Sequence, residues 1–175
     1  MGPFVNLLDR TFYPDTQENW DNDLFRERIL RHLSTEKKML DLGAGAGILK
    51  QMNFKGLAER VYGVDLDLRV LNNPYLDEAE VSSAGSLPYR DGTFDLVVCN
   101  NVLEHLPEPF EVFKEVSRVL KKGGIFLVKT PNRLHYVSVL SKLTPHGFHR
   151  FYNKLRGVKR EDTFPAYYRA NSYKE

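Results

Sequence analysis

The chain has 175 residues, and its 25 lysines and arginines nearly balance 23 aspartates and glutamates, for a formal net charge of +2. This balance excludes an acidic tail and gives no support for a nucleic-acid partner bound by charge. The 42% hydrophobic content is that of a globular protein, and the single cysteine excludes an intrachain disulfide or a multi-cysteine zinc site. No apolar run approaches the ~18 residues of a membrane helix and no secretion signal begins the chain, so we expect a soluble, cytoplasmic protein that does not contact membranes.

Apolar periodicity predicts alternating helices and strands along one domain, residues 1–175. In chain order these are a helix over 21–33, a strand over 37–42, a helix over 48–57, strands over 60–67, 79–83 and 94–100, a helix over 107–120 and a strand over 125–130. Basic residues followed by Gly123 and Gly124 are expected to end the last helix. The alternation favours right-handed βαβ crossovers, and therefore an α/β, Rossmann-like, doubly wound and mostly parallel sheet between two layers of helices.

The strongest chemical signal is a glycine-rich turn, LDLGAGAG over 40–47, between a predicted strand and a predicted helix. Glycines there let the backbone turn sharply and approach a ligand, and the helix N-terminus that follows offers free N–H groups. The glycines at 43, 45 and 47 do not match the dinucleotide fingerprint G-x-G-x-x-G, which disfavours a nicotinamide dehydrogenase. Gly47 also lacks the Lys-Ser/Thr that follows in a P-loop.

An acidic residue ends the next predicted strand. Asp65 lies 22 residues after Gly43, where a carboxylate can accept hydrogen bonds from both hydroxyls of a ribose. Asp67 follows two residues later and is expected to face solvent, although the spacing leaves the choice between the two acids open.

Five segments, in family order, resemble class I S-adenosylmethionine-dependent methyltransferases of the broad small-molecule type, which includes ubiquinone-biosynthesis-like enzymes. The segments are LDLGAGAG (40–47), VYGVDLD (61–67), SLPYRDGTFDLV (86–97), NNVLEHL (100–106) and EVSRVLKKGGIFLVKTPN (115–132). The resemblance implies S-adenosylmethionine as cofactor, bound by a core over 36–132. An N-terminal arm and helix (1–35) would precede this core, and a substrate-side segment (133–175) would follow it.

The resemblance assigns cofactor-binding positions one by one. It implies that the methionine end of the cofactor contacts Asp41, Gly43, Ala44, Gly45, Gly47 and Asn100. It implies that the ribose contacts Asp65, and that the adenine contacts Leu66, Ser83, Ala84 and Leu87. Ser83 stands where relatives usually place an aspartate that binds the adenine amino group. The Ser83 hydroxyl and the Ala84 backbone are the groups here that can replace it.

Glu104 and His105 lie just after the 94–100 strand, at the expected lip of the pocket. They are the candidate catalytic residues, with His105 as a general base. Ubiquinone O-methyltransferases and small-RNA 2′-O-methyltransferases resemble this stretch and carry Glu-x-x-Glu-His there as a metal site, but Asn101 replaces the first glutamate. A metal site of Asn101, Glu104 and His105, completed by His146 or His149, therefore remains an alternative, as does a local helix-capping role.

Other residues carry two interpretations each. Cys99 is either a buried small hydrophobe, which we expect, or a nucleophile. Tyr13 and Trp20 either close over the cofactor or pack the arm onto the domain. The basic stretch 142–160 is either a solvated surface or an attraction for an anionic acceptor.

Relatives complete their sheet with two further strands, and no such hairpin is predicted in the 43 residues after Asn132. We therefore expect the last strands to be lacking or altered, in a truncated or differently completed fold. The function expected is methyl transfer from S-adenosylmethionine to oxygen, nitrogen or carbon of a small molecule. The alternative is a non-catalytic cofactor-binding or interaction module. The oligomeric state is left open.

Overall fold

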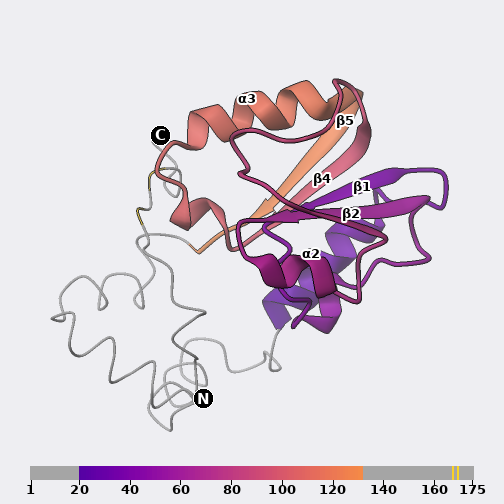
Figure 1. Cartoon of the computed structure of the whole chain (residues 1–175). Coiled ribbons are helices and arrows are strands. Elements are labelled where there is room, and N and C mark those ends of the chain that lie inside the picture. The colour runs from indigo at the N-terminus through magenta and orange to yellow at the C-terminus, as the bar shows by residue number, and fades with distance from the viewer. Residues whose placement is uncertain (1–19, 132–166, 168, 170–175) are drawn as a thin grey trace, which may run out of the picture.

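Five parallel strands form the centre of the part of the chain that the computed structural model describes, residues 20–131, 167 and 169 (Figure 1). The elements in chain order are α2 (Trp20–Leu30), β1 (Lys38–Leu42), η1 (Lys50–Met52), β2 (Arg60–Asp65), η2 (Leu68–Asn72), β3 (Glu78–Val81), β4 (Phe94–Asn100), η3 (Leu103–His105), α3 (Pro109–Val119) and β5 (Leu120–Lys129). Here η denotes a short 3₁₀ helix. The expected α/β, doubly wound parallel sheet is confirmed.

The order of the strands places a crevice at the carboxyl edge of the sheet. Their spatial order is β3-β2-β1-β4-β5, so the chain moves outward in one direction from β1 to β3 and then in the other from β4 to β5. β1 pairs in parallel with both β2 and β4, and Asp41 lies opposite Gly63 on one side and Val98 on the other. In open α/β sheets, ligands bind where the strand order reverses, which here is the end of β1 and β4.

Each face of the sheet has its own apolar core. One core joins Leu40, Leu42 and Val97 to Val112 and Val116 of α3. The other joins strand residues of alternate parity to α2 and to the segment after β1; its members include Phe25, Ile29, Met39, Phe54 and Val98. Because successive strand side chains point to opposite faces, Asp41, Asn100 and Lys129 share the α2 face with this second core.

The helix predicted over 48–57 is wrong: the structure has a 3₁₀ turn over Lys50–Met52. Gly47 and Gly56 adopt positive φ of 71° and 79°, which an α-helix does not contain. The guanidinium of Arg26 donates to the carbonyl oxygens of Gln51 and Asn53, at 2.7 Å each, and lies 4.7 Å from the centroid of the buried Phe54 ring. Contacts with α2 therefore fix this segment, and among the described residues no α-helix lies between the glycine loop and β2.

The other elements occur in the predicted order, although some of their bounds differ. α2 ends at Leu30, three residues before the predicted end, and the strand over 94–100 has the predicted bounds. α3 ends at Val119, and β5 begins directly at Leu120 instead of 125, with an irregular register against Phe94 and Leu96. The expectation that Gly123 and Gly124 end the helix is therefore wrong, because both glycines lie within β5.

Several expectations fall outside the described residues. They concern the arm with Tyr13, the basic stretch 142–160 with His146 and His149, and the last strands of the sheet. Among the described residues, every helix is too short or too polar to span a membrane.

Candidate functional site

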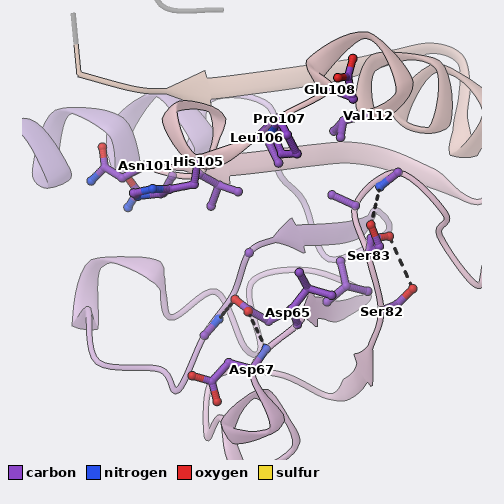
Figure 2. Close-up of a pocket in the computed structure, with 18 of the residues that line it drawn as sticks. Asp65, Asp67, Ser82, Ser83, Asn101, His105, Leu106, Pro107, Glu108 and Val112 are labelled. Atoms are coloured by element: carbon purple, nitrogen blue, oxygen red, sulfur yellow. Dashed lines mark hydrogen bonds between the residues drawn. The ribbon is translucent and has the colours of Figure 1, made fainter. Parts of the chain in front are cut away.

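Two neighbouring cavities lie at the carboxyl edge of the sheet. Their volumes are about 660 Å³ and about 210 Å³, and both are lined by Gly43, Gly45, Ala46, Ile48 and Asn100. The larger volume is within the ~300–1,000 Å³ of typical small-molecule sites. Figure 2 shows the larger cavity with Asp65 and Ser83 on one side and His105, Pro107 and Val112 on the other.

The glycine loop, residues 43–47, packs too closely on its surroundings to carry a side chain at its first position. Gly43 has a φ of +80°, and a Cβ there would lie 2.2 Å from Cγ2 of Val102. The N–H groups of Gly43 and Ala44 both donate to the carbonyl oxygen of Val64, at 2.8 and 3.1 Å. The loop therefore crosses from β1 to the end of β2 with its backbone exposed to both cavities.

Asn73 stabilises the same loop, and sequence reasoning missed it. Its Nδ2 donates to the carbonyl oxygens of Ala44 and Gly45 at 3.0 and 3.2 Å, and its side chain is buried. A Cβ on Gly47 would lie 2.4 Å from Asn73 Oδ1. The Asn-Pro dipeptide signals a turn, but nothing in the sequence connects that turn to the glycines 28 residues earlier.

Asp65 and Asp67 both line the larger cavity, so Asp67 does not simply face solvent as expected, but the two carboxylates have different partners. Asp65 lines the larger cavity, and its carboxylate accepts from the backbone N–H of Gly45 and of Asp67, both at 2.9 Å (Figure 2). Asp67 is half-buried and accepts from the Arg69 backbone N–H and guanidinium, which lower the pKa of its carboxyl group. Arg69 thus occupies the Asp67 carboxylate, while the Asp65 carboxylate is fixed against the glycine loop.

Asp41 is a buried carboxylic acid that lines the smaller cavity, with 5% of its surface exposed. Burial, with a smaller contribution from the charge of Asp65, raises its pKa to about 7. Among the described residues no hydrogen-bond donor contacts its carboxyl group. A ligand with a positive charge at this end of the site would favour the ionised form.

The serine loop, residues 82–87, borders the larger cavity on the far side of Asp65. Ser83 and Ala84 line the cavity, and Ser83 Oγ accepts from the Gly85 N–H at 3.3 Å. Leu66, three-quarters exposed, lines it as well. Leu87 does not line this cavity, because its side chain is buried in the core beneath α3.

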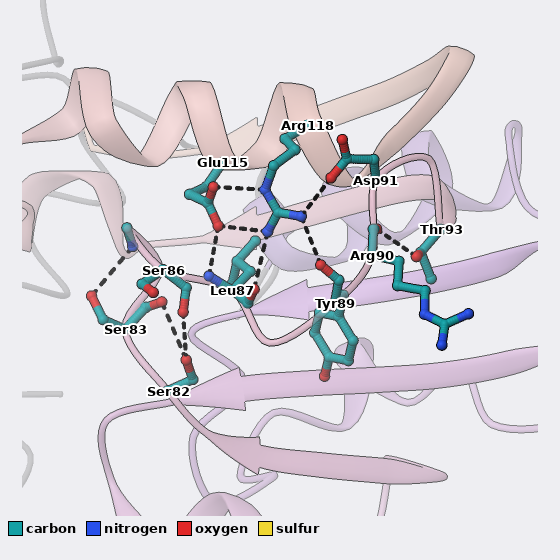
Figure 3. Close-up of polar contacts among 11 residues, drawn as sticks. Ser82, Ser83, Ser86, Leu87, Tyr89, Arg90, Asp91, Thr93, Glu115 and Arg118 are labelled. Carbon is teal, nitrogen blue, oxygen red and sulfur yellow. Dashed lines mark hydrogen bonds and ion pairs between the residues drawn. The ribbon is translucent and has the colours of Figure 1, made fainter.

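An ion pair on α3 fastens the serine loop, and sequence reasoning missed this too. Glu115 accepts from the Leu87 N–H at 2.7 Å, and Arg118 donates to Glu115, to Asp91 and to the carbonyl oxygens of Leu87 and Tyr89 (Figure 3). Hydrogen bonding to Arg118 lowers the pKa of Glu115 to about 2. The spacing of Glu115 and Arg118 is that of an ordinary helical surface pair, so only the folded structure reveals their contacts with the loop.

The candidate catalytic pair, Glu104 and His105, lies in η3 directly after β4, at the edge of the larger cavity that we call the lip. Glu104 is buried and its Oε2 accepts from Thr130 Oγ1 at 3.0 Å; its Oε1 lies 4.0 Å from Nε2 of His105. His105 lines the larger cavity with a third of its side chain exposed. Asn101 is exposed with a φ of +56°, and the described residues contain no group of three acidic, histidine or cysteine side chains placed to bind a metal.

Two residues near the C-terminal end also lie at this lip. The backbone N–H of Tyr167 donates to the Glu104 carbonyl oxygen at 2.6 Å, and Tyr167 lines the larger cavity. Arg169 donates to the Pro107 carbonyl oxygen at 2.7 Å and pairs with Glu108 at 3.2 Å. No periodicity in the sequence connected these residues to the lip.

Two further expectations can be placed. Cys99 is fully buried, and burial raises the pKa of its thiol, as expected for a small hydrophobe. Trp20 lines a separate, shallow cavity together with Lys129 and Thr130, and lines neither of the two cavities at the glycine loop.

Comparison with known proteins gives consistent results. A family model described as a methyltransferase domain matches residues 40–128. A ubiquinone biosynthesis O-methyltransferase of Burkholderia multivorans is 31% identical over a 144-residue alignment that covers 74% of this chain and 61% of that protein. The corresponding enzyme of Albidiferax ferrireducens is 30% identical over a 138-residue alignment that covers 69% of this chain and 54% of that protein. The chain thus spans less than two thirds of the length of these relatives.

Solved structures share the fold. The YcgJ protein of Bacillus subtilis superposes with a TM-score of 0.58 at 26% identity, over 76% of this chain and 58% of that one. An S-adenosylmethionine-dependent methyltransferase of Methanosarcina mazei superposes with a TM-score of 0.53 at 26% identity, over 66% of this chain and 62% of that one. The chain belongs to the methyltransferase domain family, which implies S-adenosylmethionine as its methyl donor.

Proposed function

We propose that the protein transfers the methyl group of S-adenosylmethionine to an oxygen atom of a small molecule. The observation that carries the cofactor assignment is the placement of two carboxyl groups, Asp41 and Asp65, around one glycine-rich loop. We propose oxygen as the atom that accepts the methyl group because the curated relatives are named O-methyltransferases.

The residues present fit this cofactor. Asp65 is oriented by two backbone N–H groups and lines the larger cavity, so it is the acceptor for the ribose hydroxyls. The buried Asp41, without a donor among the described residues, is suited to the positive charge of the methionine end. Ser83 and Ala84 border the same cavity and are suited to the polar edge of the adenine.

The cofactor supplies an activated methyl group on sulfur, so the protein's task is to align the acceptor and to remove its proton. His105 is the group at the lip that can take a proton from a hydroxyl. Glu104, 4.0 Å away, stabilises the charge that His105 would then carry, and Thr130 fixes Glu104 by a hydrogen bond to its other oxygen.

Isothermal titration calorimetry with S-adenosylmethionine, S-adenosylhomocysteine and NADH tests the cofactor assignment. The two sulfur nucleosides should bind and NADH should not. Asp65→Ala should weaken binding by about 2–4 kcal/mol, because a charged acceptor of two hydroxyls is lost. Asp67→Ala is the matched control: it removes a neighbouring carboxylate that Arg69 already occupies, and it should change the affinity by less than about threefold. Equal losses in both variants would contradict the assignment of Asp65.

Methyl transfer is tested separately, with S-adenosylmethionine labelled in the methyl group and a panel of phenols, amines and carbon acids. We expect label on a phenol oxygen, and His105→Gln should lower kcat about 100-fold or more with little change in cofactor affinity. Cofactor binding without transfer to any member of the panel would favour a non-catalytic binding module instead.

A further inference from the structure

A chain of three polar side chains connects the end of β5 to the cavities. Nζ of Lys129 donates to Oδ1 of Asn22 and pairs with Oδ2 of Asp21 at 2.7 Å. The same Oδ1 of Asn22 accepts from Nδ2 of Asn100 at 3.4 Å. Asn22 and Asp21 lie in the first turn of α2, whereas Lys129 and Asn100 end the neighbouring strands β5 and β4.

This series of hydrogen bonds determines which way each side-chain amide points. A lysine ammonium only donates hydrogen bonds, so Asn22 must turn its oxygen, and not its NH₂ group, toward Lys129. The NH₂ group of Asn100 must then face that oxygen. The oxygen of Asn100 is consequently directed away from Asn22, and the order of donors and acceptors is fixed by the charge of Lys129.

The side-chain oxygen of Asn100 ends this series of hydrogen bonds and has no donor of its own in the described part of the chain. Oδ1 is buried and has no hydrogen-bond partner among the described residues, although Asn100 lines both cavities. Asn22 is itself buried, with 8% of its surface exposed, so water does not readily replace its contacts. A buried acceptor without a donor is costly, and a bound ligand that supplies the donor removes that cost.

We propose that Lys129 and Asn22 are positioning residues, which orient the Asn100 amide so that its oxygen accepts a hydrogen bond from an ammonium group of the ligand. Asp41 lines the smaller cavity beside Asn100 and supplies the negative charge for the same group. The proposal rests on the proposed function, since the ammonium group is that of the cofactor's methionine end. It assigns to α2 a role in recognising one end of the cofactor.

Two nucleosides that differ in that end provide the test: S-adenosylhomocysteine, which carries the amino acid, and 5′-methylthioadenosine, which lacks it. Asn22→Leu removes the oxygen that orients Asn100 and should weaken S-adenosylhomocysteine about 5- to 30-fold in calorimetry, with less than about twofold change for 5′-methylthioadenosine. Lys129→Met should likewise weaken the binding of S-adenosylhomocysteine more than that of 5′-methylthioadenosine. Asn22→Asp keeps an acceptor of the same shape and should leave both affinities within about twofold of the wild type.

A role of Asn22 that is only structural would weaken both nucleosides equally, and that result, or no change for either, would overturn the inference. If Asn22→Leu does not fold, as judged by its thermal transition, Lys129→Met against Asn22→Asp decides the question with the same two ligands. Failure of the wild type to bind S-adenosylhomocysteine would overturn the proposed function itself, so the two failures are distinguishable.

Discussion

The glycine loop and the serine loop border the same cavity but are stabilised by different means. The glycine loop is fixed by close packing and by hydrogen bonds of its backbone: Gly43 and Ala44 donate to Val64, Gly45 donates to Asp65, Asn73 donates to the loop carbonyl oxygens, and a Cβ at Gly43 would overlap Val102. The serine loop is fixed by charged side chains of α3, through Glu115 and Arg118 (Figure 3). One loop therefore depends on shape, and the other on an ion pair contributed by a distant element.

This difference predicts which changes destabilise each loop. A shape-dependent loop should tolerate changes of pH and salt but no added atom, because close packing transmits small volume changes. A loop that depends on an ion pair should tolerate side-chain changes within itself but loosen when its partner charges are neutralised. The variants below test this contrast, beginning with the largest expected effect.

Gly43→Ala should be the most damaging substitution, at about 2–5 kcal/mol of stability, because it combines positive φ with overlap of Val102. Gly56→Ala is the matched control: its φ of +79° is nearly the same, but a Cβ there meets no atom within 4 Å. Thermal unfolding should show a loss in Gly56→Ala limited to about 1–2 kcal/mol. Adding Val102→Ala to Gly43→Ala should restore the free energy of unfolding that Gly43→Ala loses beyond the loss in Gly56→Ala. A double variant as unstable as Gly43→Ala would contradict the steric account.

Arg118→Met should loosen the serine loop and destabilise the protein by about 1–3 kcal/mol, since it removes the ion pair with Glu115 and leaves the carbonyl oxygens of Leu87 and Tyr89 without this donor. Lys114→Met breaks an exposed pair with Glu111 on the same helix and should cost less than about 1 kcal/mol. The pKa of Glu115 is lowered on folding, so its stabilisation is present above its ordinary pKa and is lost as the pH falls toward 2. Urea unfolding at pH 7 and pH 3 should show the gap between Arg118→Met and wild type narrowing at pH 3.

Asp41→Asn should stabilise the free protein and weaken cofactor binding about tenfold. The folded pKa of Asp41 is raised to about 7, so the wild type loses stability as the pH rises from about 4 to 7, and the variant does not. The melting temperature of Asp41→Asn should therefore exceed that of the wild type at pH 8 but not at pH 4. Wild-type affinity for S-adenosylhomocysteine should fall below pH 7, with a flat profile in the variant; parallel profiles would exclude Asp41 from the site.

Ser83→Asp is expected to have the smallest effect. It introduces the carboxylate that related methyltransferases usually carry there, and the exposed side chain already accepts from Gly85, which an aspartate can also do. Affinity for 5′-methylthioadenosine should rise about two- to fivefold, because the adenine amino group gains a charged acceptor. Calorimetry that shows weaker binding would place the adenine elsewhere.

The contrast between the loops also explains what the sequence could predict. The glycine loop, Asp65 and the strand over 94–100 were predictable because each depends on residue types next to one another. The helix over 48–57 was not excluded by its own sequence: Arg26 in α2 binds the carbonyl oxygens of that segment, and this competes with helix formation.

The missed residues share one property: each acts on a segment far away in the chain. Asn73 contacts the glycine loop, Arg118 contacts the serine loop, and Tyr167 contacts the lip at Glu104. Long-range contacts of this kind leave no periodicity or spacing in the sequence. Most residues that line the two cavities could thus be predicted from the sequence, and the side chains that fix the loops and the lip could not.

The most direct test of the central claim is a crystal structure of the protein with S-adenosylhomocysteine. We predict that the ribose hydroxyls contact Asp65, that the amino group lies between Asp41 and the Asn100 oxygen, and that the adenine lies at the serine loop. A ribose bound at Asp67, or a nucleoside bound outside the two cavities, would contradict the account.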